Sequence, residues 1–190
     1  MNTWNTASAI VALSMYIPLG HQIFKGIKKQ NIATWALWML LDALAAASIF
    51  AQHGNWILPA AYVLGSATMI TCMLRARTIS WTWFETTTCM LVILCLIGWK
   101  MSGPRLATIM STLSVVVATI PQLRDAYREP EEMPVFEFLG FAVSCTLSAI
   151  AGNAWTVEER FYPIICALLS ALIVIVSCKK YVEYTRLSSA

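Results

Sequence analysis

Charged residues are scarce in this chain, and their scarcity limits the kind of protein it can be. Only 12% of the 190 residues are Asp, Glu, Lys or Arg, against about 25% in a typical soluble domain. The basic residues fall in short runs between apolar stretches, a pattern that excludes a nucleic-acid-binding face. Hydrophobic residues make up 58% of the chain, and the mean hydropathy is +0.67. The composition therefore predicts a protein embedded in the lipid bilayer.

Metal-ligating and disulfide patterns are also lacking. The two histidines, His21 and His53, lie near ends of stretches that should face opposite sides of a membrane. The six cysteines all fall within or at the edge of apolar stretches, and the sequence has no CxxC pair, so we expect them to pack as small apolar residues. We also find no HExxH motif and no nucleophile–base pair. The sequence predicts no metal site, no cofactor and no enzyme.

Seven apolar stretches fill nearly the whole chain. Each is close to the length of about 20 residues that a helix needs to cross a bilayer, and the gaps contain charges and breakers such as Gly103-Pro104. The stretches cover residues 6–24, 32–51, 56–74, 83–99, 106–123, 135–151 and 161–178. The sequence thus predicts an all-α membrane protein with seven transmembrane helices.

The positions of Lys and Arg predict how the chain crosses the membrane, because basic residues near helix ends stay on the cytoplasmic side. If the N-terminus is outside, the inner basic residues are Lys25, Lys28, Lys29, Arg75, Arg77, Arg124, Arg128, Lys179, Lys180 and Arg186, and the outer ones are Lys100, Arg105 and Arg160. We therefore expect the N-terminus outside and the C-terminus in the cytoplasm, in the plasma (inner) membrane if the source is bacterial. The first stretch should remain as a helix, since no small-residue cleavage site follows it.

The chain matches itself at an offset of 103 to 104 residues. The matched pairs include Pro18 with Pro121, Trp35 with Phe138, Trp38 with Phe141, Pro59 with Pro163, and Ser66 with Ser170. The match predicts a first three-helix repeat at residues 6–75, a linker helix at 80–101, a second three-helix repeat at 104–182, and a cytoplasmic tail at 183–190. Because an even number of crossings separates the two repeats, they should have the same orientation, which is a parallel-repeat arrangement.

A short motif within this repeat resembles a known family. Ile120-Pro121-Gln122-Leu123, followed by a charged loop and an aromatic-rich stretch, resembles the PQ-loop repeat of the SWEET sugar transporters, the lysosomal amino-acid exporters and the KDEL receptor. The first repeat keeps only Pro18-Leu19 of the motif. The resemblance implies a bundle of three, one and three helices with a central solute path. SWEET-like members usually have an asparagine midway along the third helix of each repeat, where this chain has Ser66 and Ser170.

Four prolines lie in the predicted helices at matched positions. A proline inside a helix removes a backbone hydrogen bond and permits a kink. We expect Pro18 and Pro121, the latter with its neighbour Gln122, to act as hinges late in helices one and five. Pro59 and Pro163 lie early in helices three and seven, where they either bend the helix or simply begin it.

One face of the second stretch carries Trp35, Trp38 and Asp42, because spacings of three and four residues bring side chains to the same side of a helix. An aromatic face beside a polar group suits a ring-shaped polar solute such as a sugar or a nucleoside. Trp35 could equally be an interfacial anchor. The other candidate solute-binding residues are Tyr62, Ser66, Phe141, Cys145 and Ser170, although serines in membrane helices often only bridge helices.

Asp42 is the acid that we place deepest in a spanning stretch. It lies about ten residues into helix two, or roughly 15 Å at about 1.5 Å per residue, close to the middle of the bilayer. A charge at that depth costs at least about 2.5–3.5 kcal/mol on insertion scales, so such residues usually face a cavity or a partner. We expect Asp42 to take up a proton together with the solute. The alternative is a neutral acid that joins helices, for example through a serine or a tyrosine.

Together these observations predict a small-molecule transporter that works by alternating access, with its solute bound between the repeats near the midplane. The alternative is a membrane receptor or lipid-binding sensor on the same scaffold, which would bind without transport. The expected partners are a small-molecule solute and the lipid bilayer, and no nucleic acid. The oligomeric state stays open, a homo-oligomer included.

Overall fold

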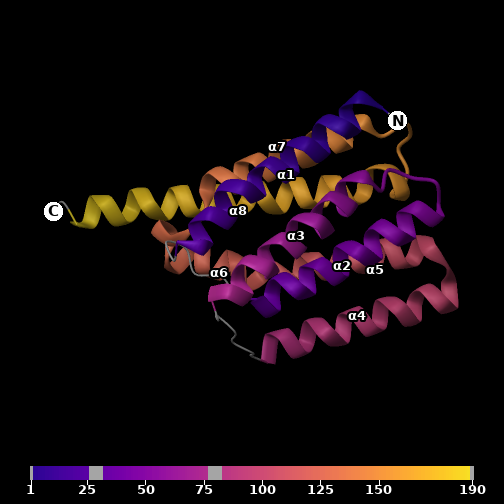
Figure 1. The fold of residues 1–190 in the computed structure, drawn as a ribbon, viewed down its shortest axis with the longest axis horizontal. Helices are drawn as coiled ribbons and strands as arrows, with labels where there is room; N and C mark the ends of the chain where they lie inside the picture. Colours follow the sequence, from indigo (N-terminus) through magenta and orange to yellow (C-terminus); the bar gives the residue numbers. More distant parts are fainter. Residues whose placement is uncertain (1, 26–31, 77–82, 189–190) are drawn as a thin grey trace.

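The fold was analysed in a computed structural model, which describes residues 2–25, 32–76 and 83–188. These residues form an all-α structure (Figure 1). Its α-helices are α1 (Thr3–Phe24), α2 (Ile32–Ala51), α3 (Ile57–Ala76), α4 (Trp83–Ser102), α5 (Pro104–Ala118), α6 (Ile120–Arg128), α7 (Val135–Ala151) and α8 (Tyr162–Ser188). A 3-10 turn, η1 (Pro130–Glu132), precedes α7, and a π-helical turn, η2 (Val157–Phe161), leads into α8. Since α6 continues α5 across Thr119, the described part of the chain forms seven helical rods.

Five helices are long and apolar enough to cross a membrane. They cover Thr3–Phe24, Thr34–Ala51, Ile57–Leu74, Pro104–Arg128 and Val157–Val182, whereas the apolar segments Cys89–Ser102 and Val135–Ala151 are shorter. Large apolar side chains point outward along these helices, and Ile17, Leu64 and Ile175 are each more than 60% exposed. These features indicate an integral membrane protein.

Consecutive rods run in opposite directions, so the bundle has two distinct ends (Figure 1). The N-terminal end holds the start of α1 and the connections after α2, α4 and α7. The turn between α4 and α5 requires Gly103, whose φ of 83° lies in the region that favours glycine. The C-terminal end holds η1 and the end of α8. The basic residues are divided between the two ends as the sequence predicts, although Lys28, Lys29 and Arg77 lie outside the described residues.

The packing order of the helices is the same in two groups of three rods. In the first group α3 contacts both α1 and α2, and in the second group α8 contacts both α7 and the α5–α6 rod. The two groups meet where α1 packs on α7 and where α2 packs on α5. The remaining helix, α4, packs on α2 and α5 at the outside of the bundle (Figure 1).

Both ends of the chain contain more helix than the sequence predicts. Helix α1 begins at Thr3 because the side chain of Asn2 accepts a hydrogen bond from the backbone N–H of Trp4 (3.2 Å), which caps the helix. Helix α8 continues through residues 183–188, where we expected a tail. No glycine or proline follows Pro163, so nothing in the sequence ends α8 before Ser188.

The two matched prolines that we expected to be hinges have different surroundings. Pro121 follows a break in the rod, where α5 ends at Ala118 and the N–H of Thr119 donates to the carbonyl groups of Val115 (3.0 Å) and Val116 (3.2 Å). Pro18 lies inside α1, which is continuous from Thr3 to Phe24. The hinge roles remain predictions, but the break is confined to the second proline.

A glycine lets one aromatic ring reach the centre of the bundle. The Tyr16 ring, on α1, lies directly against Gly65 on α3, so a methyl group at Gly65 would overlap with three ring atoms. Tyr16 is 7% exposed. The close contact between α1 and α3 therefore depends on the missing side chain at position 65.

We predict that Gly65→Ala lowers the stability of the fold, because the ring of Tyr16 has to move. Overpacking of this kind costs about 1–3 kcal/mol, which thermal unfolding in detergent can measure. The matched control is Gly20→Ala, where the new methyl group would meet only the flexible end of Met69, with its Cε at 2.8 Å. Both changes raise helix propensity equally, so equal unfolding temperatures for the two variants would contradict the prediction.

Candidate functional site

A cavity of about 80 Å³ lies between the two groups of helices. It is lined by Tyr16, Trp35, Trp38, Asp42, Tyr62, Ser66, Val115, Thr119, Phe138, Phe141, Tyr162, Cys166, Leu169, Ser170 and Ile173. A single water needs about 10–15 Å³ of such space, so the cavity has room for several waters or a compact solute. Along α2 it extends over the seven residues from Trp35 to Asp42, which corresponds to about 10 Å of helix.

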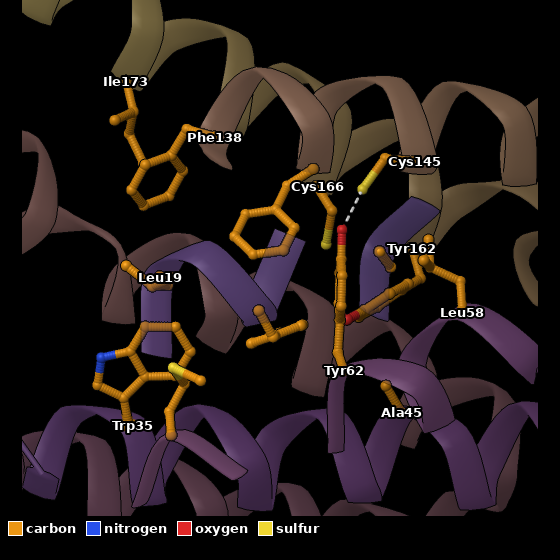
Figure 2. Close-up of a cluster of buried hydrophobic side chains, with 14 of the residues drawn as sticks. Leu19, Trp35, Ala45, Leu58, Tyr62, Phe138, Cys145, Tyr162, Cys166 and Ile173 are labelled. Carbon is orange, nitrogen blue, oxygen red and sulfur yellow. Dashed lines mark hydrogen bonds between the residues drawn. The ribbon is translucent and has the colours of Figure 1, made fainter. Parts of the chain in front are cut away.

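Aromatic rings form most of the wall. The ring of Tyr16 lies 5.0 Å from that of Phe141 and 6.0 Å from that of Trp35, measured between centroids. Trp35 in turn contacts Trp38 at 5.4 Å, edge to face. Figure 2 shows Trp35 and Tyr62 rising from α2 and α3 into the same region. These spacings fall within the range in which aromatic pairs stabilise one another, so the rings form one connected wall.

A hydrogen bond between Asp42 and Tyr162 crosses the bundle at the wall of this cavity. The hydroxyl of Tyr162, at the start of α8, donates to Oδ1 of Asp42, in the middle of α2, at 2.7 Å. Asp42 is 6% exposed and Tyr162 only 1%. None of the described residues that line the cavity is Lys or Arg. The tyrosine therefore supplies the donor that a buried carboxyl needs, as the alternative expectation for Asp42 anticipated, and proton uptake at Asp42 remains a prediction.

The hydroxyl of Tyr62 is also occupied. It lies 2.9 Å from the Sγ of Cys145 and 3.2 Å from the Oγ of Ser144, both on α7; Figure 2 draws the first contact. Cys145 has no exposed surface and is not among the lining residues. We expect Cys145 from the sequence to contact solute, but it is absent from the lining and instead contacts two lining residues, Tyr62 and Cys166.

Most of the predicted binding residues lie together at the cavity. The lining includes Asp42 and six of the candidates, namely Trp35, Trp38, Tyr62, Ser66, Phe141 and Ser170. The expected hinge residues Pro18, Pro121 and Gln122 lie outside the lining. Gln122 is buried, and its side-chain amide donates to the Sδ of Met133 at 3.5 Å.

Several lining residues were missed, and the internal match could have identified three of them. Tyr16 and Thr119 each lie two residues before a matched proline, so they occupy equivalent positions at the offset of 103. Cys166 is likewise equivalent to Tyr62 at the offset of 104. A tyrosine, a threonine or a cysteine in an apolar stretch attracts no attention by itself, and only the match relates these positions to one another and to Tyr62.

A second buried acid was missed as well. Glu137 is 2% exposed, and the side-chain amide of Gln22 donates to its Oε1 at 2.6 Å, which joins α1 to α7. This pair lies on the C-terminal side of the cavity. Because Glu137 is only two residues from the start of α7, its position in the sequence indicated a membrane surface and not the interior of the bundle.

Hydrogen bonds also join the two groups of helices on the N-terminal side of the cavity. The pairs are the Ser8 hydroxyl with the Ser144 carbonyl (2.8 Å), the Asn55 side-chain amide with the Ser148 carbonyl (3.0 Å), and the hydroxyls of Ser48 and Thr108 (2.9 Å). Among the described residues, polar contacts therefore join the two groups of helices on both sides of the cavity, with more of them at the N-terminal end.

We predict that Tyr162→Phe destabilises the protein, because it leaves the carboxyl of Asp42 without its donor. A buried polar group that loses its partner costs about 1–3 kcal/mol, seen as a lower midpoint of thermal unfolding in detergent. Tyr127→Phe is the control, since Tyr127 is 57% exposed on α6. An unchanged midpoint in the Tyr162 variant would show that the hydrogen bond contributes nothing.

The cavity offers aromatic faces, hydroxyl groups and one carboxyl group. The described residues contain no cluster of three His, Cys, Asp or Glu side chains placed to hold a metal ion, and all six cysteines are free. Comparisons with protein-family models, curated proteins and solved structures each give no match. The functional argument therefore rests on the cavity and on the arrangement of helices around it.

Proposed function

We propose that this chain transports a small polar solute across the membrane by alternating access, holding it in the cavity between two three-helix repeats. The observation that carries this proposal is that the lining comes in matched pairs from both repeats. The pairs are Tyr16 with Thr119, Trp35 with Phe138, Trp38 with Phe141, Tyr62 with Cys166, and Ser66 with Ser170. Transporters with internal repeats bind their solutes at such an interface.

The packing order supports the repeat assignment. When α1 is matched with the α5–α6 rod, α2 with α7 and α3 with α8, the contacts within one group correspond to those within the other. The same matching exchanges the two interfaces between the groups, α1 with α7 and α2 with α5. Helix α4 has no counterpart and serves as the linker. In this proposal all seven rods cross the bilayer, as in the PQ-loop and SWEET-like proteins that the motif at Pro121-Gln122 resembles.

Access would alternate between the two ends of the bundle. The hydrogen bonds around Ser144 and Ser148 join the two repeats on the N-terminal side of the cavity, and the contact of Gln22 with Glu137 joins them on the C-terminal side. Each of these contacts joins different repeats, so tilting one repeat against the other would open one side while the other stays bonded. The break before Pro121 is a natural place for the second repeat to bend.

The membrane orientation follows from the charge at the two ends. The C-terminal end would face the cytoplasm, since Lys25, Arg124, Arg128, Lys179 and Lys180 gather there, and the N-terminal end carries Lys100, Arg105 and Arg160. In this orientation the hydrogen-bonded N-terminal side is the external one. For a bacterial source the protein would lie in the plasma membrane.

Asp42 would couple transport to a proton. Its carboxyl group lines the same space as the solute, so the protonation of Asp42 and the occupancy of the cavity influence one another. An acid at membrane depth that faces a cavity is typical of proton pathways. The matched position in the second repeat is the uncharged Cys145, so a single carboxyl group would serve both directions.

We predict that Asp42→Asn abolishes gradient-driven accumulation of solute, even at solute concentrations that saturate the binding site of the variant. The amide keeps the shape of the carboxyl group and can still accept from Tyr162, but it cannot carry a proton. The measurement is radiolabelled uptake into proteoliposomes with an imposed pH gradient, with binding measured on the same preparation. Uphill, pH-sensitive uptake in the variant would overturn proton coupling, and binding without uptake by the unmodified protein would favour a receptor or sensor.

Trp38→Ala should weaken solute binding by more than about 1 kcal/mol, a typical contribution of one aromatic contact. The indole N–H of Trp38 donates to the carbonyl of Ala118 at 3.3 Å, so the ring is fixed at the cavity wall. Trp4→Ala is the control, because Trp4 is 50% exposed and distant from the lining. Equal affinities in the two variants, measured by calorimetry, would remove Trp38 from the binding site.

A further inference from the structure

We propose that the solute of this cavity is a small organic cation, such as a quaternary ammonium compound or a protonated amine. This inference rests on the proposed function for the role of the cavity, and it replaces the broader class of small polar solutes with one chemical class. Three features of the lining carry it: the sign of its charge, the number of its aromatic rings, and the polar groups that are left for a ligand.

The lining has one carboxyl group and no basic side chain. Asp42 is the acid, and Lys and Arg are absent from the residues that line the described cavity. A positive ligand would therefore meet an opposite charge in a low-dielectric site, where the attraction is strong. An anionic ligand would meet repulsion from the ionised carboxylate and no compensating partner.

Seven of the fifteen lining residues are aromatic. The negative faces of such rings attract cations that lie within about 6 Å of the ring centre, and cages of this kind recognise quaternary ammonium groups. The rings come from five helices, with Tyr16 on α1, Trp35 and Trp38 on α2, Tyr62 on α3, Phe138 and Phe141 on α7, and Tyr162 on α8. In Figure 2 Trp35, Phe138 and Tyr62 lie around one region, and Tyr162 lies next to Tyr62 on its other side. The rings thus provide a wall on several sides of a compact cation.

Few hydroxyl groups remain for a sugar. The hydroxyl of Tyr162 donates to Asp42, that of Thr119 donates to the carbonyl of Val115 (2.7 Å), and that of Tyr62 contacts α7. The hydroxyl groups of Tyr16 and Ser66 pair with each other, and the sixth hydroxyl of the lining belongs to Ser170. Recognition of a sugar or a nucleoside requires several well-placed polar partners, and five of the six hydroxyl groups are already engaged. The described contacts of Asp42 use one carboxylate oxygen, Oδ1, which leaves Oδ2 to pair with a cation.

A cationic solute also determines whether the proton and the solute cross the membrane in the same direction or in opposite directions. A carboxylate that pairs with a cation has released its proton, so a proton and the solute compete for Asp42 and are exchanged across the membrane. The titratable groups that face Asp42 are Tyr162 and Cys166 from α8, Tyr16 from α1 and Tyr62 from α3; the lining residues of α5 carry none. Asp42 is therefore the group that would titrate, and the joint uptake that we expected from the sequence becomes exchange.

Choline and its neutral analogue 3,3-dimethylbutan-1-ol provide a direct test, because they share a shape and differ in charge. We expect choline to raise the unfolding midpoint of the purified protein in nanodiscs, since a ligand of the folded state stabilises it, whereas the analogue has no effect. Asp42→Asn and Trp38→Ala should each weaken choline binding by about tenfold, and Trp4→Ala should leave it unchanged. Affinity for choline should increase as the pH rises, and it should lose this dependence in Asp42→Asn.

Transport separates this inference from the proposed function. In proteoliposomes whose membrane potential is clamped with potassium and valinomycin, an acidic lumen should drive accumulation of choline and an alkaline lumen should not. Binding of choline that depends on Asp42, without accumulation, would support the cation site and overturn the transporter. Equal stabilisation by choline and its neutral analogue, no stabilisation by choline or tetramethylammonium, or accumulation of a neutral sugar in their place would overturn the cation site.

Discussion

A carboxyl group buried among apolar helices has to find its hydrogen-bond donor within the protein, and this requirement organises the centre of the bundle. Tyr162 meets it from the first residue of α8, directly after the π-helical turn η2 and directly before Pro163. Because Asp42 belongs to the first group of helices and Tyr162 to the second, their bond also fixes how the two groups meet. Both residues line the cavity, so the aromatic wall and the space for a ligand lie around this contact.

The sequence predicts the helices well because their length and apolarity are set by the bilayer, a constraint that acts on each segment separately. It also predicts nearly half of the residues of the cavity wall, since Trp35, Trp38 and Asp42 follow from helical spacing and Ser66 and Ser170 from the internal match. Other members of the site depend on contacts between distant segments. The partner of Asp42 lies 120 residues away, and no local pattern distinguishes Tyr162 from any other tyrosine near a helix start.

Two further differences between the sequence-based expectations and the structure also arise from contacts between distant segments. Glu137 is near the end of its helix in the sequence, but the packing of α1 against α7 buries it beside Gln22. Cys145 occupies the matched position of Asp42, but its thiol contacts the Tyr62 hydroxyl and is absent from the lining. In both cases the neighbouring helices decide what the side chain faces.

The two groups of helices share a packing order and differ in chemistry. Matched lining positions carry a tyrosine and a threonine, tryptophans and phenylalanines, a tyrosine and a cysteine. The first group thus contributes the acid and both indole rings, and the second contributes smaller or less polar side chains. The cavity is therefore chemically unequal, with the carboxyl group and both indole rings on the side of α2.

Helix α8 runs from the cavity to the C-terminal end of the bundle. It starts with the donor to Asp42, passes the cavity at Ser170, and continues to Ser188 as an unbroken rod that extends past the other helices (Figure 1). The 18 residues from Ser170 to Ser188 span about 27 Å at about 1.5 Å per residue. If this helix tilts as a rigid rod, a tilt of about 10° at the cavity moves its C-terminal end by about 5 Å. A change of tilt on ligand binding in this small cavity would then displace the C-terminal end of α8 at the surface of the protein.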